Sequence, residues 1–575
     1  MPPKLTVSIG QKTDQGTKSI NQDCHGAYLP DEPQLTSKGI AVALADGISS
    51  SKVSHIASES AIKTFLEDYY CTSETWSVRT SAERVLNAIN AWLYAQTRKG
   101  PSRYDSDSGY ICTLSALVFK ATSAYLFHIG DSRIYRLRGK TLEQLTTDHR
   151  VVVSSEESHL SRALGYEEHL EIDHRSFPLQ VDDIFVLATD GVYEWLDAKT
   201  MIDILSSVDQ DLDAAAQTLI DMAQARGSDD NLTLQLVRID QLPDHDALSP
   251  LPDWSDLPPA PPLEPRMLFE GYKILRQLHG SSRSHIYLAE DQESGERVVI
   301  KTPSVDMRED PGYLERFVLE EWIARRLNSA YVLKPSPTVR QRNYIYVVTE
   351  YIEGQTLAQW MTDNPAPDLE TIRSIIEQVA RGLMAFHRLE MLHQDLRPNN
   401  IMIDVHGTAK IIDFGATRVS GLVEASASRN PPDILGTLQY TAPEYFLGET
   451  PTPRADLFSL AVIAYQMLSG KLPYGTQVSK VRTRAALKKL KYQSVLDDSK
   501  AIPAWLDAPL AKALHPDPWQ RYEELSEFLH DLRQPNPVLL NQRPTPLIER
   551  DPLLFWKGLS ALLFGVVILL LALHH

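Results

Sequence analysis

The first 240 residues alternate between apolar runs and segments with helical periodicity. The runs GIAVALADG, AYLFHIGDSR and DIFVLATDG are almost continuously apolar, which predicts buried strands, and aspartate follows each apolar core. Apolar residues recur at i, i+3 and i+4 over residues 54–70, 81–98 and 212–226, which predicts helices. A sheet core with helices outside it is a layered α/β arrangement.

From residue 267 onward, strand patterns come first and helical patterns follow. The segments RVVIK and YIYVVTEYI are rich in β-branched and aromatic residues and predict strands. Residues 371–388, 456–470 and 522–532 have helical periodicity. Strands followed by helices indicate a second, α+β unit.

Proline-rich segments separate these units from each other and from the C-terminus. The acidic segment 242–265 is too rich in proline to build a packed core, so it predicts a semi-rigid extended linker. A second, shorter segment of this kind covers residues 533–552. We therefore expect a first domain at 1–240, a linker at 241–266, a second domain at 267–533, a juxtamembrane linker at 534–552 and a C-terminal helix at 553–573.

The C-terminal stretch GLSALLFGVVILLLAL is apolar without a break, and with the LLFW before Lys557 it reaches about the 20 residues that cross a bilayer. It is apolar on all faces rather than striped, which favours a transmembrane helix over a buried C-terminal helix. Basic residues precede it and only His574 and His575 follow, so the positive-inside rule places the rest of the chain in the cytoplasm. We expect a single-pass C-terminal anchor in the cytoplasmic membrane.

Composition and charge exclude several classes of protein. The chain is 43% hydrophobic and 23% charged, as soluble globular domains are. Its net charge of −18 argues against a general nucleic-acid binder. The three cysteines, Cys24, Cys71 and Cys112, form no CxxC pair, so we expect neither a disulfide framework nor a cysteine-based zinc site.

Aspartates mark the ends of the strands predicted in the first domain. Asp46, Asp131 and Asp190 follow apolar runs, Asp230 leads into a strand, and Asp23 lies in KSINQD. Taken singly, Asp-Gly after a strand is first of all a turn dipeptide. Strands that end together would bring the carboxylates to one edge of a sheet, where they would repel one another unless cations neutralised them. Oxygen-only ligands suit Mg²⁺ or Mn²⁺.

The order N-x-D, A-D-G, G-D-S-R, T-D-G and D-D-N, with SRALG between the third and fourth motifs, resembles the type-2C metal-dependent Ser/Thr protein phosphatases. The resemblance covers about residues 5–239. It implies a β-sandwich flanked by helices and a binuclear Mg²⁺ or Mn²⁺ centre. Such a centre lowers the pKa of a bound water and holds that water in line with the phosphorus of phospho-Ser or phospho-Thr.

Motif matching to that family assigns metal-binding roles. Asp46 would bridge both metals, Gly47 would offer its carbonyl, Asp190 and Asp230 would hold one metal, and Asp131 would serve a third, weaker metal. The complete set of implied metal residues is Asp23, Asp46, Gly47, Asp131, Asp190 and Asp230.

Two positions depart from the phosphatase pattern. Lys18 stands where the family usually has the arginine that grips the phosphate, so the charge is kept and the bidentate fork is lost. Gln22 stands where the family has glutamate, which removes one formal negative charge near the metals. A phosphatase fold that has lost its activity is the alternative.

The motifs HQDLRPNN, IIDFGA and YTAPE, in this order, resemble the eukaryotic-like protein Ser/Thr kinases over about residues 271–533. The resemblance implies a bilobal α+β fold that uses ATP with Mg²⁺. Lys301 would hold the α- and β-phosphates of ATP. Glu320 is the expected helix partner of Lys301, in preference to Glu321.

The remaining kinase roles fall on the catalytic loop and the residues around it. Asp395 would orient the acceptor hydroxyl, Asn400 and Asp413 would hold Mg²⁺, and Arg397 would take the place of the lysine that contacts the transferring phosphate. The resemblance also implies supporting roles for three further residues, namely an ion pair between Glu444 and Arg521 and a brace beneath the loop by Asp456.

Two kinase motifs are incomplete. The three positions of the glycine-rich loop hold His279, Ser281 and Ser284, and Ser281 is the candidate nucleotide-binding residue there. Gln394 replaces the arginine that meets a phosphorylated activation loop in regulated kinases. We interpret this change as a loss of control by loop phosphorylation, with the chemistry retained.

The whole arrangement resembles the fused kinase–phosphatases of bacteria. The leading hypothesis is a membrane-tethered enzyme that adds phosphate to Ser/Thr residues of proteins and removes it, with its own activation segment, residues 413–444, as one candidate substrate. One alternative is an active phosphatase regulated by a nucleotide-sensing pseudokinase domain. Another is a membrane scaffold built from two inactive folds.

Overall fold

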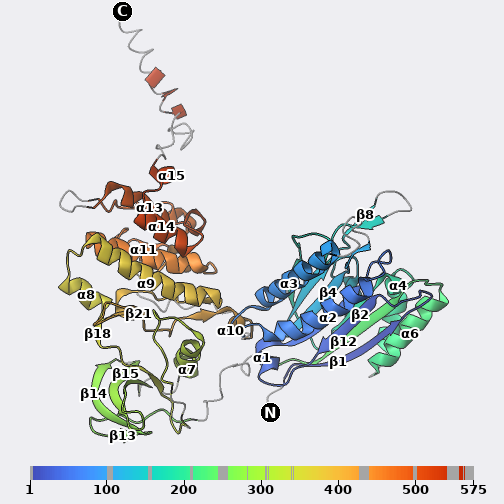
Figure 1. Ribbon diagram of the computed structural model, residues 1–575, viewed down its shortest axis with the longest axis horizontal. Coiled ribbons are helices and arrows are strands. Elements are labelled where there is room, and N and C mark those ends of the chain that lie inside the picture. Colours follow the sequence, from blue (N-terminus) through green and yellow to red (C-terminus); the bar gives the residue numbers. More distant parts are fainter. Residues whose placement is uncertain are drawn as a thin grey trace, which may run out of the picture. The chain divides into compact units, whose positions relative to one another are not determined.

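The computed structural model describes residues 4–99, 108–152, 158–207, 211–243, 257–281, 283–304, 307, 310–337, 340, 342–425, 439–496, 502–540, 556–557, 559–560 and 562–563. They form two compact units (Figure 1). The first contains the described residues of Met1–Asp256, and the second begins at Leu257 and includes the rest of the chain apart from the short segments Arg388–Met391 and Arg418–Asn430, which group with the first.

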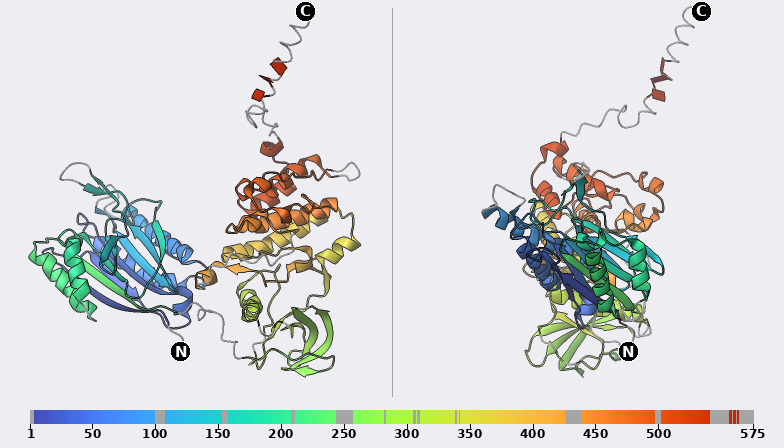
Figure 2. Two further views of the ribbon diagram at one scale, coloured as in Figure 1. Left: turned by 180° about the vertical axis from the view of Figure 1, so that it is seen from behind. Right: turned by 90° about the vertical axis from the view of Figure 1, so that its right-hand side faces the viewer.

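The first unit is a sandwich of two five-stranded antiparallel sheets with helices outside (Figures 1 and 2). One sheet has the order β1-β12-β11-β6-β7 and the other β10-β5-β4-β3-β2. The strands are β1 (Thr6–Asp14), β2 (Asp23–Tyr28), β3 (Ile40–Asp46), β4 (Leu114–Lys120), β5 (Ser123–Ile129), β6 (Arg133–Arg138), β7 (Thr141–Gln144), β10 (Asp173–Pro178), β11 (Ile184–Ala188) and β12 (Leu232–Gln241), with a separate hairpin of β8 (Arg150–Val152) and β9 (Ser158–Leu160). The helices are α1 (Gln34–Lys38), α2 (Ser54–Cys71), α3 (Val78–Lys99), α4 (Asp190–Tyr193), α5 (Ala198–Ser207) and α6 (Leu212–Ala225).

Three apolar layers explain why the central strands of this unit are almost wholly apolar. In β3, Val42 and Leu44 pack between the two sheets, whereas Ala41, Ala43 and Ala45 pack toward α2 and α3. On the far side of the sandwich, β11 and β12 pack on α4, α5 and α6. Both faces of each sheet are therefore buried, so the strands carry apolar residues at successive positions instead of alternating with polar ones.

The second unit has two lobes, one built on a five-stranded sheet and one mainly helical (Figure 1). The first lobe is the antiparallel sheet β13 (Leu268–Phe269), β14 (Tyr272–Gly280), β15 (Ser284–Asp291), β16 (Arg297–Pro303) and β17 (Val347–Glu350), together with α7 (Pro311–Arg326). The second lobe contains the helices α8 (Leu357–Asp363), α9 (Leu369–Arg388), α11 (Pro453–Ser469), α12 (Arg484–Leu487), α13 (Asp507–Ala513), α14 (Leu525–Arg533) and α15 (Pro537–Leu540). The remaining short elements are β18 (Gly354–Thr356), β19 (Met391–Leu392), β20 (Ile401–Asp404), β21 (Ala409–Ile411), β22 (Arg418–Val419), α10 (Ser420–Ala425) and the 3₁₀ turns Pro398–Asn400, Pro443–Leu447, Val478–Lys480, Ala504–Leu506 and Pro518–Gln520.

The end of the proline-rich segment packs on the second unit. Ala260 and Leu263 are buried in the apolar cluster of the five-stranded sheet, and the Ile345 backbone N–H donates to the Pro258 carbonyl at 3.0 Å. Residues 257–265 therefore contribute to the core of the second unit, although the sequence pattern assigns them to a linker. The reason is that an extended chain offers its carbonyls to a neighbouring segment while two apolar side chains supply the contact. Residues 244–256 lie outside the described residues.

Within the part of the chain that the structure describes, no helix is long and apolar enough to cross a membrane. Most of the expected span, residues 553–573, lies outside the described residues, which include only six of its positions. The C-terminal anchor therefore stays a prediction.

Two buried ionic contacts hold the helical lobe together, and both are confirmed expectations. Arg521 donates from both terminal nitrogens to Glu444, at 2.8 and 2.7 Å, and both side chains are buried. Asp456, also buried, accepts from the backbone N–H groups of His393 and Gln394, each at 3.0 Å. The helix α11 is thereby attached to the catalytic loop through a charge-assisted pair of hydrogen bonds.

Replacement of Arg521 by alanine should destabilise the second unit by about 3–5 kcal/mol, because it leaves the Glu444 carboxylate buried and unpaired. Hydrogen exchange of the α11 amides across a urea series of the whole protein measures the change. The matched control is Arg484→Ala, which removes the exposed Arg484–Glu449 pair and should cost about 0–1 kcal/mol. Equal effects of the two variants would contradict the prediction.

Candidate functional site

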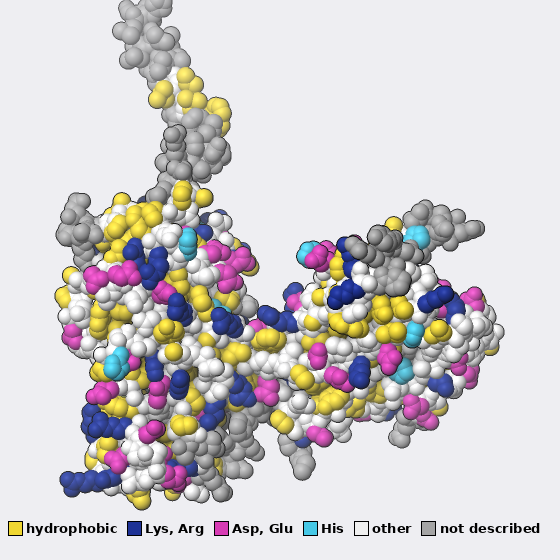
Figure 3. Space-filling model, viewed as in Figure 1, with side chains coloured by type: hydrophobic (Ala, Val, Ile, Leu, Met, Phe, Trp, Pro, Cys, Tyr) yellow, Lys and Arg dark blue, Asp and Glu magenta, His cyan; other side chains and the backbone are white. Residues whose placement is uncertain are grey.

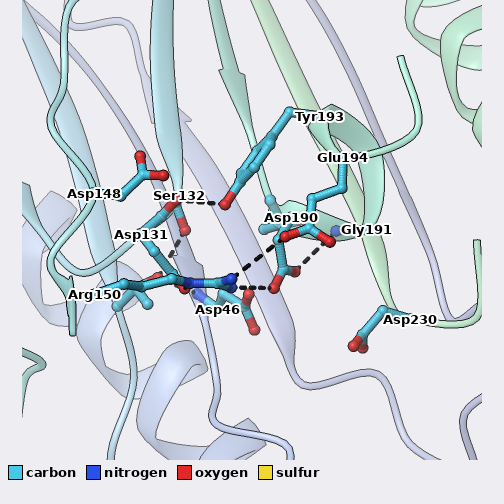
Figure 4. A network of polar contacts seen from close by, with 12 residues as sticks. Asp46, Asp131, Ser132, Asp148, Arg150, Asp190, Gly191, Tyr193, Glu194 and Asp230 are labelled. Carbon is cyan, nitrogen blue, oxygen red and sulfur yellow. Dashed lines mark hydrogen bonds and ion pairs between the residues drawn. The ribbon is translucent and has the colours of Figure 1, made fainter. Parts of the chain in front are cut away.

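Four aspartates of the first unit converge at one edge of the sandwich, where strands from both sheets end (Figure 4). Asp46 is the last residue of β3, and Asp131 follows β5 by two residues. Asp190 opens α4 directly after β11, and Asp230 precedes β12. A fifth aspartate, Asp23, is the first residue of β2 and pairs with Asp46 across the two strands. Antiparallel pairing places the start of β2 beside the end of β3, which is why these two carboxyls meet.

Burial and mutual repulsion shift the titration of these carboxyls. Burial raises the pKa of Asp23 to about 6, and it raises the pKa of Asp190 to about 7, with the charges of Asp131 and Asp230 adding to the effect. Burial also raises the pKa of Asp46 well above its usual value, and the charges of neighbouring aspartates add to it. The edge therefore carries more negative charge than its surroundings stabilise.

The donor set at this edge fits Mg²⁺ or Mn²⁺. It consists of carboxylate oxygens, and the Oδ1 atom of Asp23 is buried without a hydrogen-bond partner among the described residues. In the described residues, no group of three or more His, Cys, Asp or Glu side chains is arranged to hold a metal as it stands. Two cationic side chains already bind the carboxylates: Lys18 Nζ lies 3.1 Å from Asp230 Oδ2, and Arg150 contacts Asp131 and Asp190.

Gly47 is required at this edge by the close approach of α2. A Cβ atom on Gly47 would lie 2.8 Å from the backbone of Ser54, a distance that side chains essentially never adopt. The Gly47 backbone N–H donates to the Gln22 carbonyl at 3.1 Å. Steric packing therefore explains the glycine of the Asp46-Gly47 motif without reference to any ligand.

Gln22 supports the segment after Gly47 through its amide nitrogen. Its Nε2 atom lies 3.2 Å from the Ile48 carbonyl, 2.7 Å from the Ser51 carbonyl and 2.5 Å from Ser54 Oγ. The side chain is buried. A glutamate could not donate to those two carbonyls, so Gln22 has a structural role that a comparison of motifs alone does not reveal.

Lys301, Glu320 and Asp413 form the expected ionic cluster of the second unit. Lys301 Nζ lies 2.7 Å from both carboxylate oxygens of Glu320 and 3.9 Å from Asp413 Oδ1. Burial raises the pKa of Glu320 to about 7, an effect that the Lys301 charge opposes. Glu321, the neighbouring acid, instead pairs with Arg325 and with Arg342.

The catalytic loop brings three of the expected residues together. Asn400 Nδ2 donates to the Asp395 carbonyl at 2.9 Å and to Asp395 Oδ2 at 3.0 Å, and Arg397 Nε lies 3.7 Å from the same carboxylate oxygen. Gln394 has a φ of +66°, and Asp456 holds its backbone N–H in this conformation. The loop geometry therefore depends on the backbone and on Asp456, and the Gln394 amide nitrogen is buried without a hydrogen-bond partner among the described residues.

The segment that replaces the glycine-rich loop is a tight hairpin between β14 and β15. The Ser281 hydroxyl accepts from the backbone N–H groups of Arg283 and Ser284, at 3.2 and 3.1 Å, and lies 3.1 Å from the Ser284 carbonyl. Ser281 thus uses its side chain to close the turn, which glycine would achieve through backbone freedom alone. Residues 426–438 of the activation segment lie outside the described residues.

Arg150 is a site residue that the sequence motifs did not reveal. It begins β8, and its guanidinium group lies among the carboxylates of Asp131, Asp190 and Glu194 (Figure 4). The only signal in the sequence is a basic residue directly after the dipeptide Asp148-His149.

Comparison with known proteins matches each unit to a protein family. Residues 272–545 match the protein kinase domain model, and residues 12–236 match the protein phosphatase 2C model. The chain is 27% identical to the serine/threonine-protein kinase PrkC of Bacillus subtilis (strain 168) over 46% of its own length and 40% of that protein. It is 30% identical to the probable serine/threonine-protein kinase PknB of Bifidobacterium longum (strain NCC 2705) over 47% of its own length and 40% of that protein. The chain thus spans less than half the length of these two relatives.

A solved structure also aligns with the first unit. The catalytic domain of the serine/threonine protein phosphatase PstP, in complex with two manganese ions, is 23% identical and has a TM-score of 0.35, with 41% of this chain and 100% of that chain covered. Together, the two family models establish that the chain joins a protein phosphatase 2C domain to a protein kinase domain. The predicted sandwich flanked by helices and the predicted bilobal kinase fold are both confirmed.

Replacement of Gln22 by glutamate, the residue usual in the phosphatase pattern, should destabilise the first unit by about 1–3 kcal/mol. The carboxylate cannot donate to the Ile48 and Ser51 carbonyls, so both hydrogen bonds from residue 22 are lost and the two carbonyl oxygens face a buried negative charge instead. The effect is measured in the whole protein as the change in hydrogen-exchange protection of the β3 amides with rising temperature. The control is Gln11→Glu, because the Gln11 side-chain oxygen is an acceptor and glutamate keeps one. A Gln22→Glu protein as stable as the control would contradict the prediction.

Proposed function

We propose that the chain is a bifunctional enzyme that phosphorylates Ser/Thr residues of proteins with ATP and hydrolyses phospho-Ser and phospho-Thr. The observation that carries the proposal is that both domains keep their charged site residues in place, at the aspartate edge of the first unit and in the Lys301–Glu320–Asp413 cluster of the second. An inactive fold has no need to keep buried charges in such arrangements.

In the phosphatase domain, Asp46, the Gly47 carbonyl, Asp190 and Asp230 would hold two Mg²⁺ or Mn²⁺ ions, and Asp23 would support them. When bound, such ions supply an acidified water as nucleophile. Lys18, which now pairs with Asp230 at 3.1 Å, would bind the substrate phosphate. As a point charge, Lys18 binds a phosphate with less directional selectivity than an arginine fork does.

In the kinase domain, Lys301 would hold the α- and β-phosphates of ATP, and Glu320 fixes the orientation of its ammonium group. Asn400 and Asp413 would hold Mg²⁺. Asp395 would orient the acceptor hydroxyl, and Arg397 would neutralise charge on the phosphoryl group as it transfers. The nucleotide would also lie against the hairpin that contains Ser281. The backbone of this hairpin would contact the phosphates in place of a glycine-rich loop.

The proposal also covers the attachment of the enzyme to the membrane and the proteins on which it acts. A C-terminal transmembrane helix at 553–573 would hold both catalytic domains at the cytoplasmic membrane, supported by the unbroken apolar run of that segment. Because both domains are in one chain, the kinase's own phosphorylated activation segment would reach the phosphatase at a high effective concentration. Other substrates would be proteins that carry Ser or Thr residues for the kinase, or phospho-Ser or phospho-Thr residues for the phosphatase.

The test uses the full-length protein with γ-labelled ATP and Mg²⁺/Mn²⁺. We expect label to accumulate on the Asp46→Asn protein and to be lower on wild type, because the kinase domain adds the phosphate and the phosphatase domain removes it. Label should be absent from the protein that combines Asp46→Asn with Asp395→Asn. Lys301→Met in the Asp46→Asn background should reduce labelling at least about 100-fold, because the phosphates lose their positioning charge. No label on Asp46→Asn, even with a generic protein substrate, would instead favour the regulatory pseudokinase.

Membrane attachment is tested by fractionation. We expect the full-length chain to sediment with membranes and to be extracted by detergent but not by high salt, because apolar insertion is insensitive to ionic strength. A chain that ends at residue 552 should remain in the supernatant. Recovery of both proteins in the supernatant would exclude the anchor.

A further inference from the structure

Arg150 places a positive charge between two of the aspartates at the phosphatase edge (Figure 4). Its Nε donates to Asp131 Oδ2, and one terminal nitrogen lies 2.8 Å from Asp190 Oδ2. The other terminal nitrogen lies 3.4 Å from Glu194 Oε1. One planar guanidinium group therefore contacts three carboxylates that come from two separate segments of the chain, Asp131 after β5 and Asp190 with Glu194 at α4.

The position of Arg150 is fixed by the residues directly before it. The His149 backbone N–H donates to the Gly130 carbonyl at 2.8 Å, and the Gly130 N–H donates back to His149 Nδ1 at 3.1 Å. Arg133 donates to Asp148 from Nε, at 3.0 and 3.1 Å from the two carboxylate oxygens, and from one terminal nitrogen at 2.7 Å. Since Gly130 and Arg133 flank Asp131, the start of β8 is attached to the chain on both sides of that aspartate.

The aspartate that Arg150 contacts is itself held in place from the other side. The Tyr193 hydroxyl donates to the Asp131 carbonyl at 3.0 Å, and the Arg133 guanidinium lies 3.9 Å from the centre of the Tyr193 ring. The Asp131 side chain is only 6% exposed. The pair of Asp131 and Arg150 is therefore a built arrangement with several supports, unlike a surface ion pair between mobile side chains.

Arg150 takes up the carboxylate oxygens that a metal ion between Asp131 and Asp190 would need. A divalent ion binds carboxylate oxygens at about 2.0–2.6 Å. The Oδ2 atoms of both aspartates already accept from the guanidinium, and Asp190 Oδ1 accepts from the Gly191 N–H at 2.8 Å. An ion that bridges the two Oδ2 atoms would have to displace a cation that is covalently part of the chain and cannot lose its charge.

We propose that Arg150 is a built-in counter-ion that replaces a metal at the Asp131–Asp190 pair, so that this phosphatase domain works with two bound ions and excludes a third. The inference rests on the proposed phosphatase function. It assigns Asp131 to Arg150 and leaves Asp46, Gly47, Asp230 and the remaining lone pairs of Asp190 to the two ions. A tethered cation supplies its charge at every metal concentration, whereas a weakly bound ion does so only when the metal is abundant.

The test counts bound Mn²⁺ by electron paramagnetic resonance, without nucleotide, in full-length protein that carries Asp413→Asn to remove the kinase contribution. The parent should bind two ions and Arg150→Ala three, the third with a dissociation constant about 10–100-fold weaker because it has fewer carboxylates. Arg150→Lys, which keeps the charge, should bind two. Adding Asp131→Asn to Arg150→Ala should return the count to two. Arg226→Ala, which removes an exposed arginine of the same unit, is the control and should bind two.

The outcomes separate this inference from the function on which it rests. Two ions in both the parent and Arg150→Ala would overturn the inference and leave the phosphatase proposal intact; a rise in KM for p-nitrophenyl phosphate in that variant would then identify Arg150 as a phosphate-binding residue. Three ions in the parent, or a third ion that persists after Asp131→Asn, would also overturn it. No bound ion in any protein would overturn both. Retention of two ions by Arg150→Ala shows that the variant is folded.

Discussion

The first unit is organised around the repulsion between carboxylates that its strands deliver to one edge. Asp23 and Asp46 meet because two antiparallel strands pair, and Asp190 joins them from the other sheet. These positions are partly buried, and desolvation together with mutual repulsion raises the pKa of each of these carboxyls. Positive charge is therefore a structural requirement of the edge, and Lys18 and Arg150 supply part of it.

In the second unit, ion pairs within the domain neutralise several of the buried charges. Lys301 pairs with Glu320, and Arg521 pairs with Glu444. Asp456 accepts backbone hydrogen bonds from the catalytic loop and has a contact with His387 at 3.0 Å. On the face of the molecule shown in Figure 3, acidic and basic side chains are interspersed, as they are on solvated surfaces. The buried charges of this domain thus lie both at the nucleotide site and in structural ion pairs away from it.

Much of the fold could be predicted from the sequence because its local signals agree with the tertiary structure. The helices predicted at 54–70, 81–98 and 212–226 are α2, α3 and α6, and the predicted strands near Asp46 and Asp190 are β3 and β11. The order of the aspartate motifs indicated which strand ends bring carboxylates together. The choice of Glu320 over Glu321, which the kinase resemblance implied, also agrees with the contact between Lys301 and Glu320.

The sequence by itself determined the two classes of domain, their order and the residue types at both sites, because periodicity and motif spacing are local properties of a chain. Only the tertiary structure decided which side chains neutralise the carboxylates. Arg150 reaches Asp190 from 40 positions away. Gln22 supports carbonyls 26 and 29 positions away, and Leu263 packs into a core that its proline-rich surroundings did not suggest. Such contacts depend on how strands and loops meet in space, and no local pattern of residues specifies that meeting.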